Sequence, residues 1–220
     1  AIDLTKANFD FYAGGGFLKP DKTHDRKDAP NIFPIFEEAG YTVARGYNDY
    51  KAKSKDAGKM ILIQEEGKDP SCLPYAIDRK SDDLTLAQIT ESAIDFLTKG
   101  KNKGFFLMVE GSQLDDYGHF NDIDLLMQET HDFDRTIGRI FEWAAQDGET
   151  LVVVTADHET GGLTLVDGDL NEGRIVCKFS TGGHSGVMVP VYAFGPGAEN
   201  FTGIFENTDI FWKIKKLLNL

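Results

Sequence analysis

Two uninterrupted apolar runs, each followed at once by an acid, constrain the fold of this chain more than any other feature. Residues 105–109 read FFLMV and precede Glu110, and residues 151–156 read LVVVTA and precede Asp157. The first run is too continuous for a half-exposed strand and predicts a strand buried on both faces; the second repeats the pattern. Because an ionised acid is costly to bury alone, each run is expected to open onto a site at its carboxyl end.

Helical and extended patterns alternate along the rest of the chain. Helices are predicted over residues 31–39, 84–97, 122–146 and 209–218, and strands over residues 9–13, 41–44, 60–64 and 189–194. A hairpin is predicted between residues 163–166 and 173–179, across DGDLNEG. In the last helix the inward face is expected to comprise Ile210, Phe211, Ile214, Leu217 and Leu218. We therefore expect one α/β domain over residues 1–220.

Three consecutive glycines, Gly14, Gly15 and Gly16, follow the first predicted strand. Such a turn can cradle phosphate, but GGG without a following GK or GxxG is more typical of a plain tight turn. His24 lies in the polar stretch beyond it, residues 19–31, and is expected to be solvated rather than a metal ligand.

The charge of the chain limits its partners. The 220 residues carry a formal charge of −13, from 36 acids and 23 bases. This excess without a long basic run argues against nucleic acid or an anionic membrane surface as the main partner. No apolar run approaches the ~20 residues of a membrane span. An anionic substrate would have to be attracted locally, and bound divalent cations are the obvious source.

The cysteines and the first residue say little about the compartment. Cys72 and Cys177 lie far apart without a CxxC pattern, which indicates neither a redox motif nor a zinc ribbon and leaves a disulfide between them open. The chain starts abruptly at Ala1 without a signal peptide, so we expect it to be cut from a longer protein.

Carboxylates and imidazoles gather in three segments of the chain. Asp115 and His119 are four residues apart, so a helical turn would place both on one face. Asp157 and His158 follow the second apolar run, and His184 lies in a glycine-rich turn where it has little to pack against. A helix-capping Asp157 beside an exposed His158, and a solvated His184, remain the alternatives.

This mixture of ligands suits particular metals and one class of reaction. Carboxylate with imidazole matches Zn²⁺, and Glu110 is left for a harder ion such as Mg²⁺. Two metals about 3.5–4 Å apart would clamp the attacking and leaving oxygens of a displacement at phosphorus. The pattern therefore favours hydrolysis of a phosphate ester.

Several of these segments resemble a known family. MVEGSQLDDYGH, VVVTADHETGG and GGHSG, in this order, resemble the metal-binding segments of alkaline phosphatases, and LPYAID and FENTDIFWKIKKLL are similar too. The resemblance covers nearly all of this chain but only the C-terminal half of the family's chain. It implies a three-layer sandwich with a mostly parallel central sheet, two Zn²⁺ per complete site together with Mg²⁺, phosphate monoester substrates, a homodimer, and a periplasmic or extracellular location.

The resemblance also implies roles for individual residues. Asp115, His119 and His184 match ligands of the first zinc, Asp157 and His158 match two ligands of the second, and Glu110 matches a magnesium ligand. The family's nucleophilic serine, its bridging aspartate, further magnesium ligands and the phosphate-binding arginine belong to a region that precedes Ala1. No catalytic residue is therefore expected here. Alone, the chain is expected to bind about one Zn²⁺ and to hydrolyse aryl phosphates poorly or not at all.

Some questions stay open at this point. Asp116 stands where many relatives carry lysine, histidine or tryptophan, so its role is undecided. Ser112 and Ser185 lie near predicted ligands, but neither follows a strand at a helix N-terminus, as a nucleophile would. A non-catalytic zinc-binding or structural module is the main alternative, followed by a related metal phosphoesterase such as a phosphodiesterase or phosphoglycerate mutase. No cysteine motif supports a sulfatase.

Overall fold

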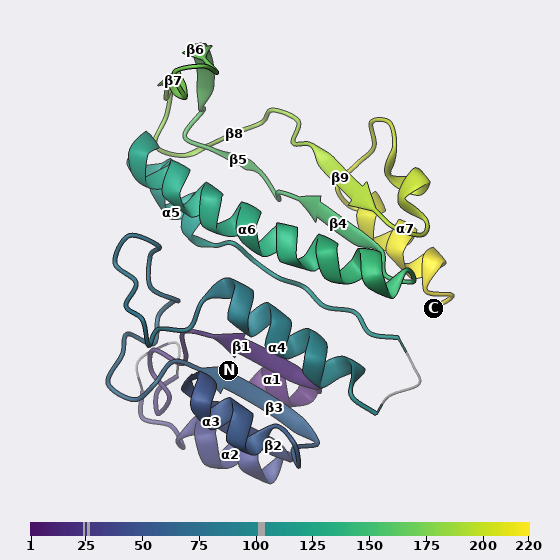
Figure 1. Cartoon of the computed structure of the whole chain (residues 1–220). Helices are drawn as coiled ribbons and strands as arrows, with labels where there is room; N and C mark the ends of the chain where they lie inside the picture. Colours follow the sequence, from purple (N-terminus) through teal and green to yellow (C-terminus); the bar gives the residue numbers. More distant parts are fainter. Residues whose placement is uncertain (24, 26, 101–103) are drawn as a thin grey trace. The chain divides into compact units, whose positions relative to one another are not determined.

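The computed structural model describes residues 1–23, 25, 27–100 and 104–220, and the chain divides into two compact units, residues 1–110 and 111–220 (Figure 1). Each unit is described by itself. His24 lies outside the described residues, so its expected solvation stays a prediction. The expectation of a single α/β domain also stays a prediction.

Unit 1 is built on a parallel sheet of three strands in the order β1, β3, β2. These strands are β1 (Phe11–Gly14), β2 (Tyr41–Arg45) and β3 (Lys59–Ile63). Leu62 of the central strand lies in register with Ala13 on one side and Ala44 on the other. β3 takes the centre because its residues Met60 to Ile63 are all apolar and at most 4% exposed.

Helices cover both faces of this sheet (Figure 1). Met60 and Leu62 point to one face, where α3 (Gly46–Lys53) and α4 (Leu86–Thr98) contribute Tyr50 and Phe96. Ile61 and Ile63 point to the other face, where α2 (Ile32–Glu38) contributes Phe36 and α1 (Ile2–Ala7) lies alongside. This helix–sheet–helix layering confirms the predicted α/β class, and α2, β2, β3 and α4 fall where the sequence pattern places them.

The predicted buried strand over residues 105–109 is wrong. The segment forms no strand, and Phe106 and Met108 are 62% and 76% exposed, whereas Phe105 and Leu107 pack against the cluster around α4. Extended backbone turns successive side chains to opposite sides, and within the described residues only one side of this segment is covered. Continuous apolarity therefore did not mean burial on both faces.

Unit 2 opens with two helices, α5 (Gln113–Phe120) and α6 (Ile123–Asp147). α6 confirms the helix predicted over residues 122–146: Asp122 caps it by accepting a hydrogen bond from the Leu125 amide, and Gly148 ends it in the left-handed conformation. β4 (Val152–Thr155) pairs antiparallel with β9 (Val191–Phe194), and β5 (Glu159–Thr160) pairs antiparallel with β8 (His184–Ser185). The β5–β8 pair carries two of the segments singled out above.

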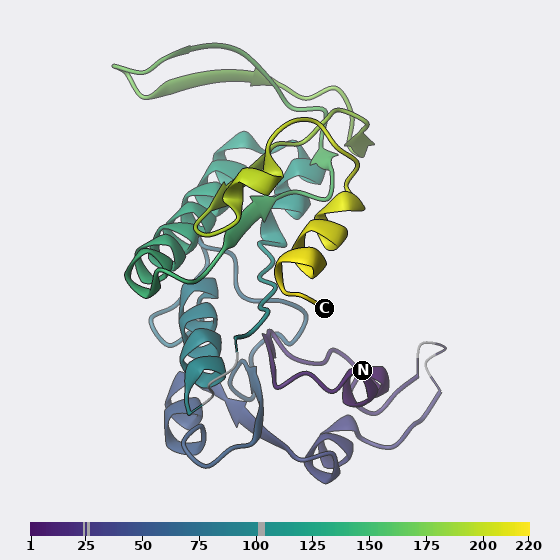
Figure 2. The same cartoon turned by 90° about the vertical axis from the view of Figure 1, so that its right-hand side faces the viewer.

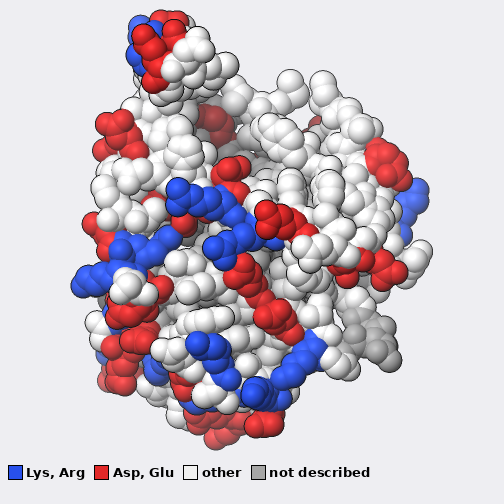
Figure 3. Space-filling model, in the orientation of Figure 1, with Lys and Arg blue, Asp and Glu red and all other residues white. Residues whose placement is uncertain are grey.

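The predicted hairpin is confirmed, with a longer first strand and a shorter second strand than expected. It comprises β6 (Thr164–Asp169) and β7 (Arg174–Lys178), with an irregularity between Leu165 and Asp167. The hairpin projects from the rest of unit 2 (Figure 2) and bears acidic and basic side chains together at its tip (Figure 3). Arg174 lies 3.6 Å from Asp167 and 3.3 Å from Glu172.

The chain ends with a short 3₁₀ helix, η1 (Ala198–Phe201), and with α7 (Asp209–Leu217), which confirms the last predicted helix. The predicted inward face of α7 is only partly right. Ile210 and Ile214 are half-buried, but Phe211 is 60% and Leu218 45% exposed. η1 covers one side of the helix in the described residues, so the rest of its apolar face meets solvent.

Two further expectations can be compared with the described residues. Cys72 of unit 1 and Cys177 of unit 2 are each a free thiol in the described residues, and the question of a disulfide between the two units stays open. Among the helices described, none combines the length and the apolar character that crossing a membrane requires.

Candidate metal centre

α5 brings together the first two predicted ligands. Asp115 and His119 are one helical turn apart, and the His119 Nε2 atom lies 3.3 Å from the Asp115 Oδ2 atom. The predicted helical turn is thus confirmed, and both side chains lie on the same face of α5.

β8 adds a third predicted ligand. Pairing with β5 sets His184 opposite Thr160. The His184 Nε2 atom lies 3.2 Å from His119 Nε2 and 3.7 Å from Asp115 Oδ1. Two ring nitrogens and one carboxylate, from residues up to 69 positions apart in the sequence, therefore lie close together as a small triangle.

This triangle can be tested against the geometry of a metal site. Zinc–ligand bonds of about 2.0–2.1 Å in a tetrahedron place neighbouring ligand atoms about 3.3–3.4 Å apart. The two imidazole nitrogens lie 3.2 Å apart, His119 Nε2 lies 3.3 Å from Asp115 Oδ2, and His184 Nε2 lies 3.7 Å from the other oxygen of the same carboxylate, Oδ1. The three side chains are 34% to 45% exposed, which leaves one side of the triangle open to solvent. These residues fit a zinc ion with an open position for a further ligand.

A backbone carbonyl orients one of the imidazoles. His119 Nδ1 lies 2.8 Å from the Gly182 carbonyl oxygen. Because a carbonyl only accepts, Nδ1 carries the hydrogen and donates it, which leaves the Nε2 lone pair facing Asp115 and His184. The loop before β8 therefore sets the tautomer that a metal ligand requires.

Thr160 organises the centre although we did not select it from the sequence. Its Oγ1 atom donates a hydrogen bond to Asp115 Oδ1 at 2.5 Å and lies 3.3 Å from His158 Nδ1. The available signal was its position two residues after His158, since alternate residues of an extended segment share a side. Gly118 permits this approach, because a Cβ at Gly118 would lie 2.9 Å from the Thr160 side chain.

Asp157 and His158 form a second pair beside the triangle. His158 Nε2 lies 3.3 Å from Asp157 Oδ2, and the His158 ring stacks on that of His184 with centroids 3.6 Å apart. Ligand atoms of Asp115, His158 and His184 also lie within 4.8 Å of one another. Two overlapping groups of ligands thus share Asp115 and His184. Asp157 is 87% exposed and contributes from the rim.

Glu159 ties β5 to β8 beneath these side chains. Its carboxylate accepts hydrogen bonds from the Leu163 amide at 2.7 Å and from Ser185 Oγ at 2.5 Å. Burial works to raise the pKa of Glu159, but the hydrogen bonds from Ser185 and the backbone outweigh it and lower the pKa below the ordinary value. Glu159 is therefore an ionised structural link.

The sixth predicted ligand belongs to the other unit. Glu110 is the last residue of unit 1, where it is exposed, whereas the other five lie in unit 2. Its role in binding magnesium stays a prediction. The five in unit 2 are brought together as described: Asp115, His119, Asp157, His158 and His184.

Comparisons with known proteins give a consistent result. The sequence model of the family described as Alkaline phosphatase matches residues 10–176. Alkaline phosphatase 3 of Bacillus subtilis (strain 168) is 32% identical over 283 aligned residues, which cover 97% of this chain and 59% of that protein. Alkaline phosphatase of Escherichia coli (strain K12) is 35% identical over 152 residues, covering 62% and 32% of the two chains.

Solved structures are also similar. Alkaline phosphatase from the Antarctic bacterium TAB5 superposes with a TM-score of 0.84 and 38% identity, covering 99% of this chain and 63% of that chain. A variant of the TAB5 protein has been solved with Mg bound in its M3 site. The chain thus spans 59% of the length of the Bacillus subtilis relative and 63% of the length of the TAB5 protein.

Proposed function

The chain belongs to the alkaline phosphatase family, and from this premise we propose that it forms the zinc-holding part of a phosphomonoester hydrolase. The observation that carries the proposal is the triangle of Asp115, His119 and His184, in which the two imidazole nitrogens lie 3.2 Å apart and each lies 3.3 to 3.7 Å from an oxygen of the Asp115 carboxylate. The substrate class is the phosphate monoester.

Each predicted ligand has a place in this proposal. Asp115, His119 and His184 hold one Zn²⁺, Asp157 and His158 contribute to a second, and Glu110 contributes to Mg²⁺. When bound, such ions neutralise the charge of a phosphate group and stabilise the attacking and leaving oxygens at phosphorus. They also supply the local positive charge that a chain with a net charge of −13 needs to attract an anionic substrate.

The chain's own groups prepare the ligands for this role. Gly182 holds the His119 tautomer through Nδ1, and Thr160 holds one oxygen of Asp115. Ligands that are fixed in this way lose less freedom on binding a metal than mobile ones. The side chains of Asp115, His119 and His184 are 34% to 45% exposed, which leaves room for a phosphate oxygen to reach them.

Neither serine near the centre is arranged as a nucleophile. Ser185 Oγ donates to Glu159, whose lowered pKa makes it a poor base, and Ser112 Oγ donates to the Gln113 side-chain oxygen at 3.3 Å. We therefore propose that the nucleophile is supplied by another segment of the complete enzyme. By itself this chain should bind Zn²⁺ but hydrolyse aryl phosphates poorly or not at all.

The test measures zinc binding and turnover separately. Calorimetric titration of the purified chain should give about one tight Zn²⁺ site, which Asp115→Asn and His184→Gln abolish and Asp167→Asn on the exposed hairpin does not. p-Nitrophenyl phosphate hydrolysis should rise when the segment of the Bacillus subtilis relative that this chain does not cover is added. Zinc binding without any gain of activity would instead favour a structural zinc module. Robust turnover by the chain alone, lost on Ser112→Ala or Ser185→Ala, would overturn the proposal.

Assembly and location follow from the same premise. We propose that the complete protein is a homodimer exported to the periplasm or the cell exterior, because this is what its resemblance to alkaline phosphatases implies. Size-exclusion chromatography with light scattering and fractionation of the source cells test the two statements. A monomer, or activity confined to the cytoplasmic fraction, would contradict them.

A further inference from the structure

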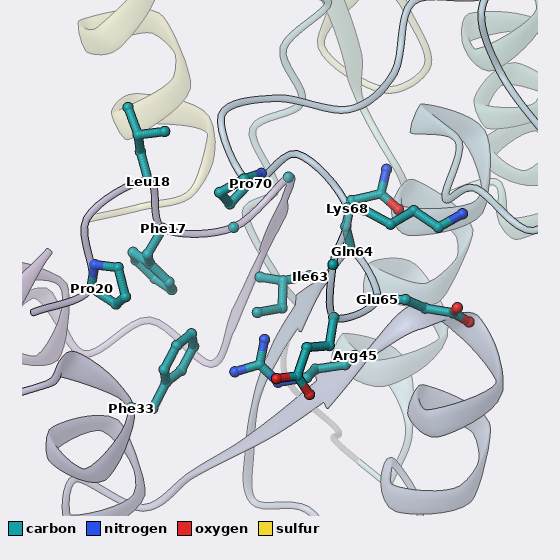
Figure 4. A pocket seen from close by; sticks show the side chains of 14 residues that line it. Phe17, Leu18, Pro20, Phe33, Arg45, Ile63, Gln64, Glu65, Lys68 and Pro70 are labelled. Carbon is teal, nitrogen blue, oxygen red and sulfur yellow. The ribbon is translucent and has the colours of Figure 1, made fainter.

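A cavity of about 300 Å³ lies in unit 1 at the carboxyl ends of its three parallel strands (Figure 4). Its walls include Gly15 and Gly16 after β1, Arg45 at the end of β2, and Ile63 with the loop that follows β3. This cavity takes no part in the metal centre, all of whose clustered ligands belong to unit 2.

The connections of the sheet explain why an opening forms there. From β1 the chain passes to α2 on one face, whereas from the neighbouring β3 it passes to α4 on the opposite face. The two outgoing loops therefore diverge between adjacent strands. In open α/β sheets this switch of direction marks the crevice in which ligands bind.

The glycines after β1 shape the wall of this crevice. A Cβ at Gly15 would lie within 2.4 Å of the Cys72 carbonyl oxygen, and one at Gly16 would lie 3.1 Å from the Pro70 side chain. Close approach of the 70–72 loop thus requires Gly15, which explains the GGG turn by packing. A phosphate cradle is not needed to account for it.

The lining includes one half-buried cation and one buried hydrogen-bond donor that has no partner among the described residues. The Arg45 guanidinium lies 4.4 Å above the Phe33 ring, and its charge also acts on the Asp49 carboxylate. Gln64 is 3% exposed; its Oε1 atom accepts from the Leu84 amide, while Nε2 has no partner. An unpaired buried donor is costly, so Gln64 Nε2 favours a ligand that brings an acceptor.

The remaining lining defines what the rest of the ligand is like. Phe17, Phe33 and Pro70 are apolar walls (Figure 4). Lys68 also lines the cavity, but its ammonium group is held by Asp82 at 2.9 Å and Asp83 at 2.5 Å. A singly charged anion with an apolar body matches the single Arg45 guanidinium, for which the described residues show no ion pair.

Two acids of the lining argue against a more highly charged ligand. Glu65 and Glu66 border the same cavity, and their carboxylates would repel a dianion such as phosphate more strongly than a monoanion. We propose that this cavity binds a small aromatic or aliphatic monocarboxylate, with its carboxylate on Arg45 and its apolar body against Phe17 and Phe33. The planar guanidinium matches a carboxylate in shape as well as in charge.

Benzoate is the probe for this site. Titrated into the 220-residue chain and followed by amide NMR shifts, it should perturb residues 15–17, Arg45 and Gln64, and neutral benzamide should bind at least about tenfold more weakly. Arg45→Gln should weaken benzoate by a similar factor. Arg135→Gln, a change at an exposed arginine of α6, should leave the affinity unchanged.

A second pair of variants does not depend on changing a buried side chain. Leu18 lines the cavity and is 63% exposed, so charged residues there should be tolerated by the fold. Leu18→Lys should tighten benzoate binding and Leu18→Glu should weaken it, each by about threefold. Equal affinities in these two variants, benzamide binding as tightly as benzoate, inorganic phosphate binding more tightly than benzoate, or no binding at all would each overturn the proposal.

Discussion

Single residues that are not themselves ligands hold the candidate centre in shape. The Gly182 carbonyl sets the tautomer of His119, and the Thr160 hydroxyl occupies one oxygen of Asp115. Groups in this position usually matter nearly as much as the ligands, because they decide where the lone pairs point. The geometry of the centre therefore depends on at least two residues, Thr160 and Gly182, that are not among the predicted ligands.

Thr160→Val should weaken Zn²⁺ binding by about tenfold or more. The substitution keeps the shape of the side chain but removes the hydroxyl that holds Asp115 Oδ1. Competition with a chromophoric chelator measures the affinity. Thr160→Ser should retain most of it, and Thr164→Val on the exposed strand β6 should behave like the wild type. Wild-type affinity in Thr160→Val would show that the hydroxyl does not position Asp115.

The buried carboxylate of Asp83 gives a prediction about pH. The Lys68 ammonium and the Lys80 amide hydrogen-bond Asp83 and lower its pKa below the ordinary value of 3.8, with nearby Asp82 also bound to Lys68. Because the pKa of Asp83 is lower in the folded state than in the unfolded state, its ionised carboxylate stabilises the fold at pH values above the unfolded-state pKa. This contribution is lost as the pH falls through the folded-state pKa. Wild type should therefore exceed Asp83→Asn in stability at pH 7, and the difference should shrink below about pH 3.8.

Urea denaturation of both proteins between pH 7 and pH 3 checks this expectation. Asp78→Asn, a carboxylate-to-amide change between Cys72 and Asp83, serves as the control; its stability relative to wild type should not follow the same trend. A gap between wild type and Asp83→Asn that stays constant with pH would rule out the ionised pair as its origin.

The contact between the elements α5 and β5 involves Gly118, a glycine inside a helix. Gly118 costs about 1 kcal/mol of helix propensity relative to alanine. The gain lies in packing, since the Thr160 side chain occupies the space of the missing Cβ, and Gly161 lies against the Gly118 carbonyl. The helix carrying two ligands can therefore approach the strand that orients them.

Gly118→Ala should destabilise the protein by about 1–3 kcal/mol, because the added methyl overpacks a contact that starts at 2.9 Å. Gly138→Ala is the matched control: Gly138 lies on α6 with nothing within 4 Å of an added Cβ, so this change should stabilise by about 0.5–1 kcal/mol. Urea denaturation measures both. Similar stabilisation by the two alanines would contradict the packing argument.

At the scale of the whole molecule, the candidate metal ligands are unevenly divided between the two units. Five lie in unit 2 and only Glu110 lies in unit 1, whose core is the three-stranded parallel sheet. A ligand that binds the folded state stabilises it by an amount that grows with the logarithm of the ligand concentration over the dissociation constant. The protection of amides from exchange should be greatest around the binding site.

Zinc should therefore slow amide hydrogen exchange in α5, β5 and β8 and leave β1, β2 and β3 nearly unchanged. At 100 times the dissociation constant the stabilisation should reach about 2.7 kcal/mol. Exchange followed by mass spectrometry, with and without Zn²⁺, makes the measurement, and Asp115→Asn should remove the effect. Equal protection of both units would show that the binding site is not confined to unit 2.

Local patterns in the sequence were enough to locate most elements. The helical spacing of apolar residues predicted α2, α4 and α6, the turn signal in DGDLNEG predicted the β6–β7 hairpin, and the four-residue separation of Asp115 and His119 predicted their common face. These features depend on backbone periodicity and on capping within a few residues, so neighbouring residues suffice to determine them.

Burial and the composition of the centre were decided by the tertiary structure. Phe106, Met108 and Phe211 are apolar yet exposed in the described structure, and the contact of Thr160 with Asp115 joins residues 45 positions apart in the sequence. The stacking of His158 on His184 likewise joins residues from two strands. The sequence determines which side of an element is apolar or carries ligands, but distant segments determine what that side meets, because packing and coordination act across space rather than along the chain.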